Sequence, residues 1–313
     1  MSTIAANVNA LNFQRYTPVY KNQVSFQPSF SGIASDTVSF SGVKDKENFE
    51  ELNKSKVLSL AACLWSKTTK KSDFLLNGHI SELKDLQKDG TVIIYAPKHY
   101  DTKDVPSLIK LFDSMTSDVK EFQETFPFFM RKKYKDKRSL KDKILLKIKD
   151  NMGAFSVDTD GNGSGRKALA TALKVVESKN PFMIFPEGEF GLKYAGQPIS
   201  EEKQELQPIK KGLSFIVQRL ISAKQKDKYP ENFKVVVVPI GISGEAGGRG
   251  PSSVYVGKPI DVFATLPAKI ESAKLLNDKL NILTHEFQSA MQEAQNSAYK
   301  EYNLAQTKIP KAC

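Results

Sequence analysis

The chain has 313 residues and a formal net charge of +11 at pH 7, and 40% of its residues are hydrophobic. This length provides material for one large or two small packed domains. No apolar run approaches the roughly 18 residues that a transmembrane helix needs, so we expect no membrane-spanning segment. The N-terminal residues lack the pattern of a secretory signal. Only two cysteines and three histidines are present, so we expect neither a disulfide scaffold nor a metal site, and we expect a reducing, cytoplasmic location.

The positive charge is concentrated in one segment. Residues 131–149 hold ten Lys or Arg side chains and two Asp side chains, which together supply +8 of the net charge. Such a segment either binds an anionic partner or is the solvated face of a helix. The anionic partner could be a phospholipid surface, an acidic carrier protein, a phosphorylated substrate or nucleic acid. Because no recognised nucleic-acid-binding module accompanies the segment, we expect an anionic membrane surface and no nucleic acid.

The predicted elements begin after a polar N-terminal region. Residues 1–45 show no helical or strand periodicity and are interpreted as a flexible tail, and Val57–Trp65 is interpreted as a short buried helix. Beyond them, apolar runs bounded by Gly or Pro predict strands, and apolar residues at helical spacing predict helices. The strands are expected at 90–97, 126–130, 154–157, 181–188, 235–242 and 253–257, and the helices at 105–115, 141–149, 166–178, 211–223 and 275–300.

Alternating strands and helices indicate an α/β fold. We therefore expect a single domain with a mostly parallel central sheet flanked by helices. We place this domain at residues 46–305 and a short C-terminal tail at 306–313. In open α/β sheets, functional residues collect in the loops beyond the carboxyl ends of the strands, so these loops are the places to look for a site.

The loop after the strand at 90–97 contains a histidine and a carboxylate. His99 is followed five positions later by Asp104, where the next helix is predicted to begin. The carboxylate could hold one ring nitrogen and leave the other to take a proton, as in a general base with its orienting group. Alternatively, Asp104 could simply cap the helix. The spacing alone does not separate these two roles.

The loop after the strand at 181–188 contains the tetrapeptide Phe185-Pro186-Glu187-Gly188. Glu187 follows an apolar run, and Gly188 would allow a ligand to approach the backbone closely. The same residues could equally form an ordinary turn at a strand end.

Taken in order, these motifs resemble those of the glycerolipid acyltransferases, the family of the 1-acylglycerol-3-phosphate and glycerol-3-phosphate acyltransferases. The resemblance covers roughly residues 92–260. It consists of H-x-x-x-x-D, then FPEG, then Lys210-Lys211-Gly212 before a helix, and finally VGKPI at 256–260. It implies the α/β fold already expected, and it implies an O-acyltransferase.

The resemblance also implies a mechanism and a set of substrates. His99 would deprotonate the acceptor hydroxyl and Asp104 would orient its ring, with direct transfer from acyl-CoA or acyl-carrier protein and no other cofactor. No serine lies in a G-x-S-x-G motif, which agrees with transfer without an acyl-enzyme. The acceptor would be a lysophosphatidic acid or glycerol-3-phosphate type precursor of phospholipids, with Glu187 a partner of its hydroxyl. The implied substrate-binding residues are Phe185, Pro186, Glu187, Gly188, Lys98 and Lys211.

Several positions depart from the family pattern, among them Glu189, which adds a negative charge after FPEG. Lys98 stands where Asn is usual before the histidine, and Thr159 and Phe190 stand where arginines usually hold the acceptor phosphate. A bidentate guanidinium is not easily replaced. Either other cations supply the charge, or the acceptor is a non-phosphorylated or amino-acid lipid. A catalytically silent lipid-binding protein is a further alternative. The cations that could supply the charge are Lys98, Lys103, Arg166 and Lys193.

Overall fold

The structure is a computed structural model that describes residues 74–99, 104–132, 152–157, 164–188, 206–244, 252–264 and 273–308. These residues all belong to one compact unit, Asp45–Cys313. The predicted tail at 1–45 and the helices predicted at 57–65 and 141–149 lie outside the described residues. The domain boundaries at 46 and 305 therefore stay predictions.

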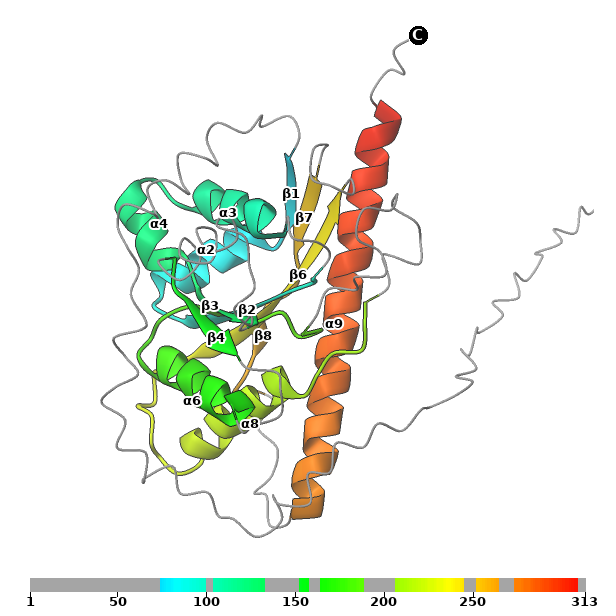
Figure 1. The fold of residues 1–313 in the computed structure, drawn as a ribbon. Helices are drawn as coiled ribbons and strands as arrows, with labels where there is room; N and C mark the ends of the chain where they lie inside the picture. The colour runs from blue at the N-terminus through cyan, green and yellow to red at the C-terminus, as the bar shows by residue number, and fades with distance from the viewer. Residues whose placement is uncertain are drawn as a thin grey trace, which may run out of the picture. The chain divides into compact units, whose positions relative to one another are not determined.

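An eight-stranded sheet with helices on both faces forms the body of the described structure (Figure 1). Every strand and helix that was predicted within the described residues is present, mostly with ends that differ by one or two residues. The strand expected at 181–188 is limited to Phe182–Met183, and the helix expected at 275–300 continues to Lys308. Four further elements were not predicted, namely β1, α2, α4 and β8. In chain order the elements are β1 (Phe74–Gly78), α2 (Ile80–Lys88), β2 (Val92–Pro97), α3 (Asp104–Met115), α4 (Val119–Thr125), β3 (Phe128–Lys132), β4 (Ala154–Val157), α6 (Ser164–Glu177), β5 (Phe182–Met183), α8 (Gly212–Lys224), β6 (Val235–Gly244), β7 (Ser252–Val256), β8 (Ile260–Asp261) and α9 (Ala273–Lys308).

The strands are ordered β1-β7-β6-β2-β5-β3-β4, and β8 pairs with β6 outside this path. The pairs β1–β7, β2–β6, β2–β5, β3–β5 and β3–β4 are parallel. Only β6–β7 and β6–β8 are antiparallel among the described pairs. The predicted fold class, an α/β domain with a mostly parallel sheet flanked by helices, is confirmed.

Strands β2 and β6 form the centre of the sheet and are buried along their whole lengths. Side chains on successive residues point to opposite faces of a sheet, and this divides the core into two layers. Ile93 and Tyr95 of β2 pack with the apolar faces of α2, α3 and α4. Ile94 and Ala96 pack with those of α6, α8 and α9. Both faces of β2 are therefore covered by helices, as its continuous apolar sequence requires.

Helix α9 packs against β6 and β7 on one face of the sheet and lies beside them in Figure 1. The two backbones come very close at Gly241 of β6, where a Cβ atom would collide with the carbonyl group of Ala294 and would lie 2.8 Å from the Cα atom of Gln295. Gly257 is also tight, since a Cβ there would lie 3.2 Å from that of Ala294. Small residues on both sides thus allow the helix to lie directly on the sheet.

Within the described part of the chain, no helix combines the length and the apolar character that crossing a membrane would require.

Candidate active site

His99 and Asp104 lie together at the carboxyl end of β2. The backbone N–H of Lys98 donates to the carbonyl oxygen of Ile240 at 2.9 Å, so the pairing of β2 with β6 continues up to the residue before His99. Asp104 is the first residue of α3. Its Oδ2 atom lies 2.8 Å from Nδ1 of His99. The histidine side chain is 20% exposed and the aspartate side chain is 2% exposed. The imidazole can thus reach a substrate while its partner is shielded from water.

The ring of His99 packs against the ring of Phe185, which comes from the FPEG turn. The two ring centroids are 4.4 Å apart and the planes are inclined by 33°. The aromatic contact restricts rotation of the imidazole about its own axis and gives it an apolar wall. The structure thus brings together the two loops that the sequence had singled out separately.

The FPEG segment forms a tight turn after β5. The N–H of Gly188 donates to the carbonyl oxygen of Phe185 at 2.9 Å, and Gly188 has a φ of +78°. Glycine is favoured here because this conformation is one that residues with a side chain rarely adopt. The N–H of Lys210 in turn donates to the carbonyl oxygen of Pro186 at 2.8 Å. The turn is therefore joined to the segment that precedes α8.

Glu187 is part of this turn and is only 3% exposed. Its Oε1 accepts the backbone N–H of His99 at 2.7 Å, and its Oε2 accepts the backbone N–H of Gln207 at 2.9 Å. Burial raises the pKa of Glu187, whereas the positive charge of Lys98 and the two amide hydrogen bonds act in the opposite direction. Lys98 is itself 3% exposed. The carboxylate thus joins the histidine loop to the segment before α8.

The other predicted site residues are either exposed or have no side chain among the described residues. Lys211 lies at the N-cap of α8 with an exposed side chain. Among the described residues, no hydrogen bond or ion pair joins it to His99 or Glu187. Thr159 and Phe190, which stand where arginines were expected, lie outside the described residues. The same holds for Lys103 and Lys193, and of Arg166 only the backbone is described. The roles assigned to all these residues stay predictions.

Sequence reasoning missed the residues that hold the segment 206–210. The N–H of Leu206 donates to Oε1 of Gln292 at 2.9 Å, and the N–H of Ile209 donates to Oε1 of Gln288 at 2.8 Å. Both glutamines belong to α9. Gln288 and Gln292 are four positions apart, so they share one face of a helix. This spacing was the sign in the sequence that both could bind the same segment. Nothing in the sequence indicated which segment they would meet.

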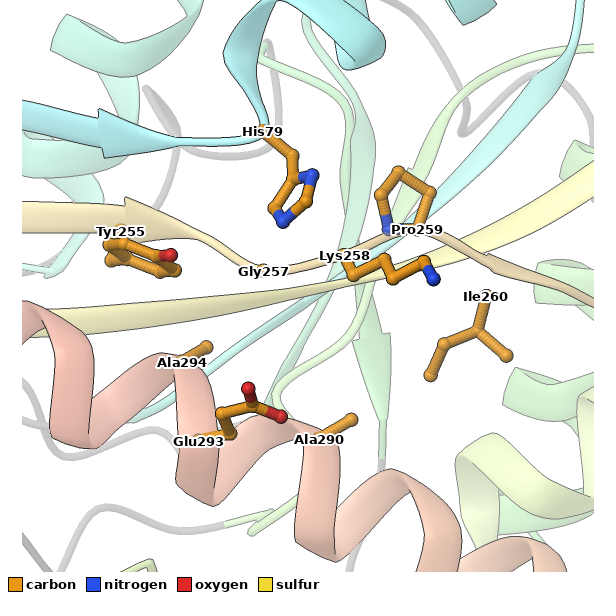
Figure 2. A pocket seen from close by; sticks show the side chains of 9 residues that line it. All are labelled: His79, Tyr255, Gly257, Lys258, Pro259, Ile260, Ala290, Glu293 and Ala294. Atoms are coloured by element: carbon orange, nitrogen blue, oxygen red, sulfur yellow. The ribbon is translucent and has the colours of Figure 1, made fainter.

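A pocket of about 390 Å³ lies elsewhere, between the end of β7, the end of β1 and α9. Figure 2 shows His79 and Glu293 extending into it from opposite walls, with Lys258 of the VGKPI motif beside them. His79 is bonded through Nδ1 to Glu82 at 2.9 Å. None of the predicted catalytic or substrate-binding residues lines this pocket. Among the residues that the structure describes, no group of three or more His, Cys, Asp or Glu side chains could hold a metal ion.

Comparison with known proteins gives one family and a similar solved structure. A family model described as Acyltransferase matches residues 79–243, more than half of the chain. No curated protein matches the chain. Among solved structures, the chain is similar to the 1-acyl-sn-glycerophosphate (LPA) acyltransferase PlsC of Thermotoga maritima, with 15% sequence identity and a TM-score of 0.40 over 75% of this chain and 76% of that chain.

Proposed function

Because the chain belongs to the acyltransferase family, we propose that it transfers a fatty acyl group from an acyl thioester to a hydroxyl group of a glycerolipid precursor. Family membership and the enzyme class agree with the prediction from the sequence motifs. The donor is acyl-CoA or acyl-carrier protein. The acceptor is of the lysophosphatidic acid or glycerol-3-phosphate type, and the motif resemblance is the basis for both assignments.

The observation that carries the proposal is the 2.8 Å contact between His99 and Asp104. An ionised carboxylate can only accept a hydrogen bond, so the contact favours a proton on Nδ1 of the imidazole. The lone pair of the neutral ring is then on Nε2. This is the tautomer that a general base needs, and the carboxylate also stabilises the imidazolium that forms when the ring takes a second proton.

In the proposed reaction Nε2 of His99 takes the proton of the acceptor hydroxyl while the oxygen attacks the carbonyl carbon of the thioester. The carbon–sulfur bond then breaks, and the leaving thiolate recovers the proton from the imidazolium. The products are an ester and a free thiol, and the histidine returns to its starting state. No group on the protein becomes acylated.

The test is an acyl-transfer assay with the full chain. Labelled palmitoyl-CoA and palmitoyl-acyl-carrier protein are offered separately with lysophosphatidic acid, glycerol-3-phosphate or a non-phosphorylated lysolipid. His99→Ala should lower kcat by at least the roughly 10²- to 10⁴-fold that general base catalysis typically supplies. Asp104→Asn should lower kcat strongly at a nearly unchanged KM, because an amide no longer fixes the tautomer.

The matched control is His285→Ala, since His285 is an exposed histidine on α9. It should leave turnover within twofold of the wild type. Near-normal turnover by His99→Ala would exclude the proposed base. Binding of the acyl thioester without transfer to any of the acceptors would instead favour a silent lipid-binding protein.

A further inference from the structure

Two buried acidic residues lie beside His99, namely Asp104 and Glu187. The reaction scheme above uses Asp104 but not Glu187. Its two carboxylate oxygens accept N–H groups from two different segments, His99 at 2.7 Å and Gln207 at 2.9 Å. Both donors belong to the backbone. Hydrogen bonds from backbone amides to an ionised carboxylate are among the stronger ones in proteins, so they hold the two segments at fixed positions.

The family resemblance implies a different role for Glu187, a direct contact with the acceptor hydroxyl. That role requires a carboxylate that substrate can reach. A carboxylate has about four lone-pair sites, so two amide bonds do not exhaust its capacity. Exposure is more restrictive, because only 3% of the Glu187 surface is accessible, compared with 20% of the His99 side chain. The imidazole is therefore the more accessible of the two groups, and the carboxylate is shielded.

We propose that Glu187 is a positioning residue, which sets the place of His99 by holding its backbone N–H and does not bind the acceptor. This proposal rests on the proposed function, in which His99 acts as the base. The arrangement of His99 N–H, the Glu187 carboxylate and Gln207 N–H is called the Glu187 clamp below.

The clamp is attached to the rest of the fold through the segment 206–210. This segment is bound to α9 through two glutamine side chains, Gln292 to Leu206 and Gln288 to Ile209. Its last residue is bound to the FPEG turn through Pro186. The second amide that Glu187 needs is therefore held on both sides. Disturbing this attachment should move His99 even though α9 contributes no residue to the predicted catalytic set.

The kinetic test compares Glu187→Gln and Glu187→Asp with the wild type, using palmitoyl-CoA and whichever of the three acceptors the wild type uses. The amide of Gln presents an N–H group to one of the two backbone donors, and Asp is too short to reach both. Displacing a catalytic group by about 1 Å can lower the rate on the order of 10²-fold. We therefore expect kcat to fall on this order while KM for the acceptor stays within twofold. A KM that rises tenfold or more with kcat nearly unchanged would overturn the proposal.

The control for the carboxyl-to-amide change is Glu177→Gln, because Glu177 is exposed and accepts a hydrogen bond from the hydroxyl of Tyr229, away from His99. It should leave kcat and KM unchanged within twofold.

A second measurement does not depend on activity. Hydrogen–deuterium exchange followed by mass spectrometry reports the protection of the His99 amide in a peptide that contains β2 and the residues after it. The wild type should protect this amide, and Glu187→Ala, which removes the acceptor of both backbone N–H groups, should speed its exchange at least tenfold without substrate. Unchanged exchange would overturn the proposal. If the wild type transfers no acyl group at all, the proposed function fails, while the exchange comparison still decides whether the clamp exists.

The attachment to α9 is tested by Gln292→Leu, which removes the bond to Leu206 and leaves Glu187 intact. Its matched control is Gln295→Leu, because Oε1 of Gln295 accepts a backbone N–H at 2.9 Å from Ile242 of β6. We expect both variants to lose stability. Only Gln292→Leu should speed exchange of the His99 amide and lower kcat several-fold. Equal effects on kcat in the two variants would show that the loss follows stability and would contradict the positioning role.

Discussion

Lys98 and Glu187 are two buried residues of opposite charge whose charges interact although they are far apart in the sequence. A buried charge is strongly disfavoured unless groups of opposite charge and hydrogen bonds replace its lost water. Glu187 receives two amide hydrogen bonds and the field of the Lys98 ammonium group. These contributions offset part of the effect of burial, but burial remains the larger influence on the pKa of Glu187, which is raised.

The raised pKa predicts how stability depends on pH. A carboxyl group whose pKa is higher in the folded than in the unfolded protein stabilises the fold below its unfolded pKa of about 4.3. That contribution is lost as the pH rises towards the folded pKa. The free energy of unfolding of the wild type minus that of Glu187→Gln should therefore shrink as the pH rises above about 4.3. Urea denaturation at half-unit pH intervals measures it, with Glu124→Gln as a surface reference. A difference that widens with pH would contradict a raised pKa for Glu187.

The local part of the site was predictable from sequence, and the distant part was not. His99 and Asp104 are five residues apart in one loop, so their contact needs only a strand end and a helix start. The bonds of Glu187 to His99 and of Leu206 to Gln292 span 88 and 86 residues. Such contacts depend on strand order and on where α9 lies, which one sequence does not specify. Glu187 was recognised as a site residue, but its amide partners could not be.

Among the helices and strands, those with long apolar runs were predicted correctly, and several with short or weak patterns were missed. The long apolar runs of β2 and β6 were found because strands buried on both faces contain no polar positions. The run at 181–188 is equally apolar at its start, but the strand itself is limited to Phe182–Met183 because the FPEG turn begins at Phe185. Strand β8 has only two residues, which is too short for any pattern. Helix α2 was missed although Ile80, Leu83 and Leu86 share one of its faces.

The packing of α9 on β6 gives a prediction for Gly241. A Cβ at this position would meet the backbone of Ala294 and Gln295, which cannot move aside as a flexible side chain can. Overpacking of this kind typically costs about 1–3 kcal/mol of stability and sometimes more. Because the collision is with backbone, Gly241→Ala should lower the free energy of unfolding by at least about 3 kcal/mol, the upper end of that range, measured by chemical denaturation.

Gly212 in the first turn of α8 provides the matched control. A Cβ there would meet its nearest neighbours at 3.7 and 3.9 Å, which is ordinary van der Waals contact. Alanine also favours a helix over glycine by up to about 1 kcal/mol. Gly212→Ala should be neutral or slightly stabilising. Equal losses in the two variants would mean that α9 does not lie as close to β6 as described.

At the scale of the whole molecule, the uneven charge suggests where a lipid surface would bind. The segment 131–149 supplies +8 of the net +11, and most of it lies outside the described residues. Each Lys or Arg near an anionic leaflet contributes about 1 kcal/mol of binding, and salt screens exposed charges beyond roughly 10 Å at about 0.1 M. The anionic membrane surface remains our proposal for the partner of this segment.

Co-sedimentation with phosphatidylserine-containing vesicles tests this proposal. Binding should weaken as salt is raised, and replacing Lys132, Lys133, Lys135 and Lys137 by Gln should release the protein. The matched control replaces four lysines of separate helices, Lys88, Lys120, Lys224 and Lys300, and should bind as the wild type does. If both quadruple variants bound equally well, the segment would not be the membrane contact.

The attachment of the segment 206–210 to α9 has a consequence for the order of events during synthesis. Helix α9 follows every other described element, so β2, the FPEG turn and the segment 206–210 all leave the ribosome before Gln288 and Gln292 exist. Contacts between residues this far apart form late, because the chain must first close a long loop. A nascent chain can therefore hold His99 and Asp104 side by side while its Gln207 amide is still unplaced. The bonds from Gln288 and Gln292 to this segment can form only after α9 has been made, so we expect the Glu187 clamp to be completed late in folding.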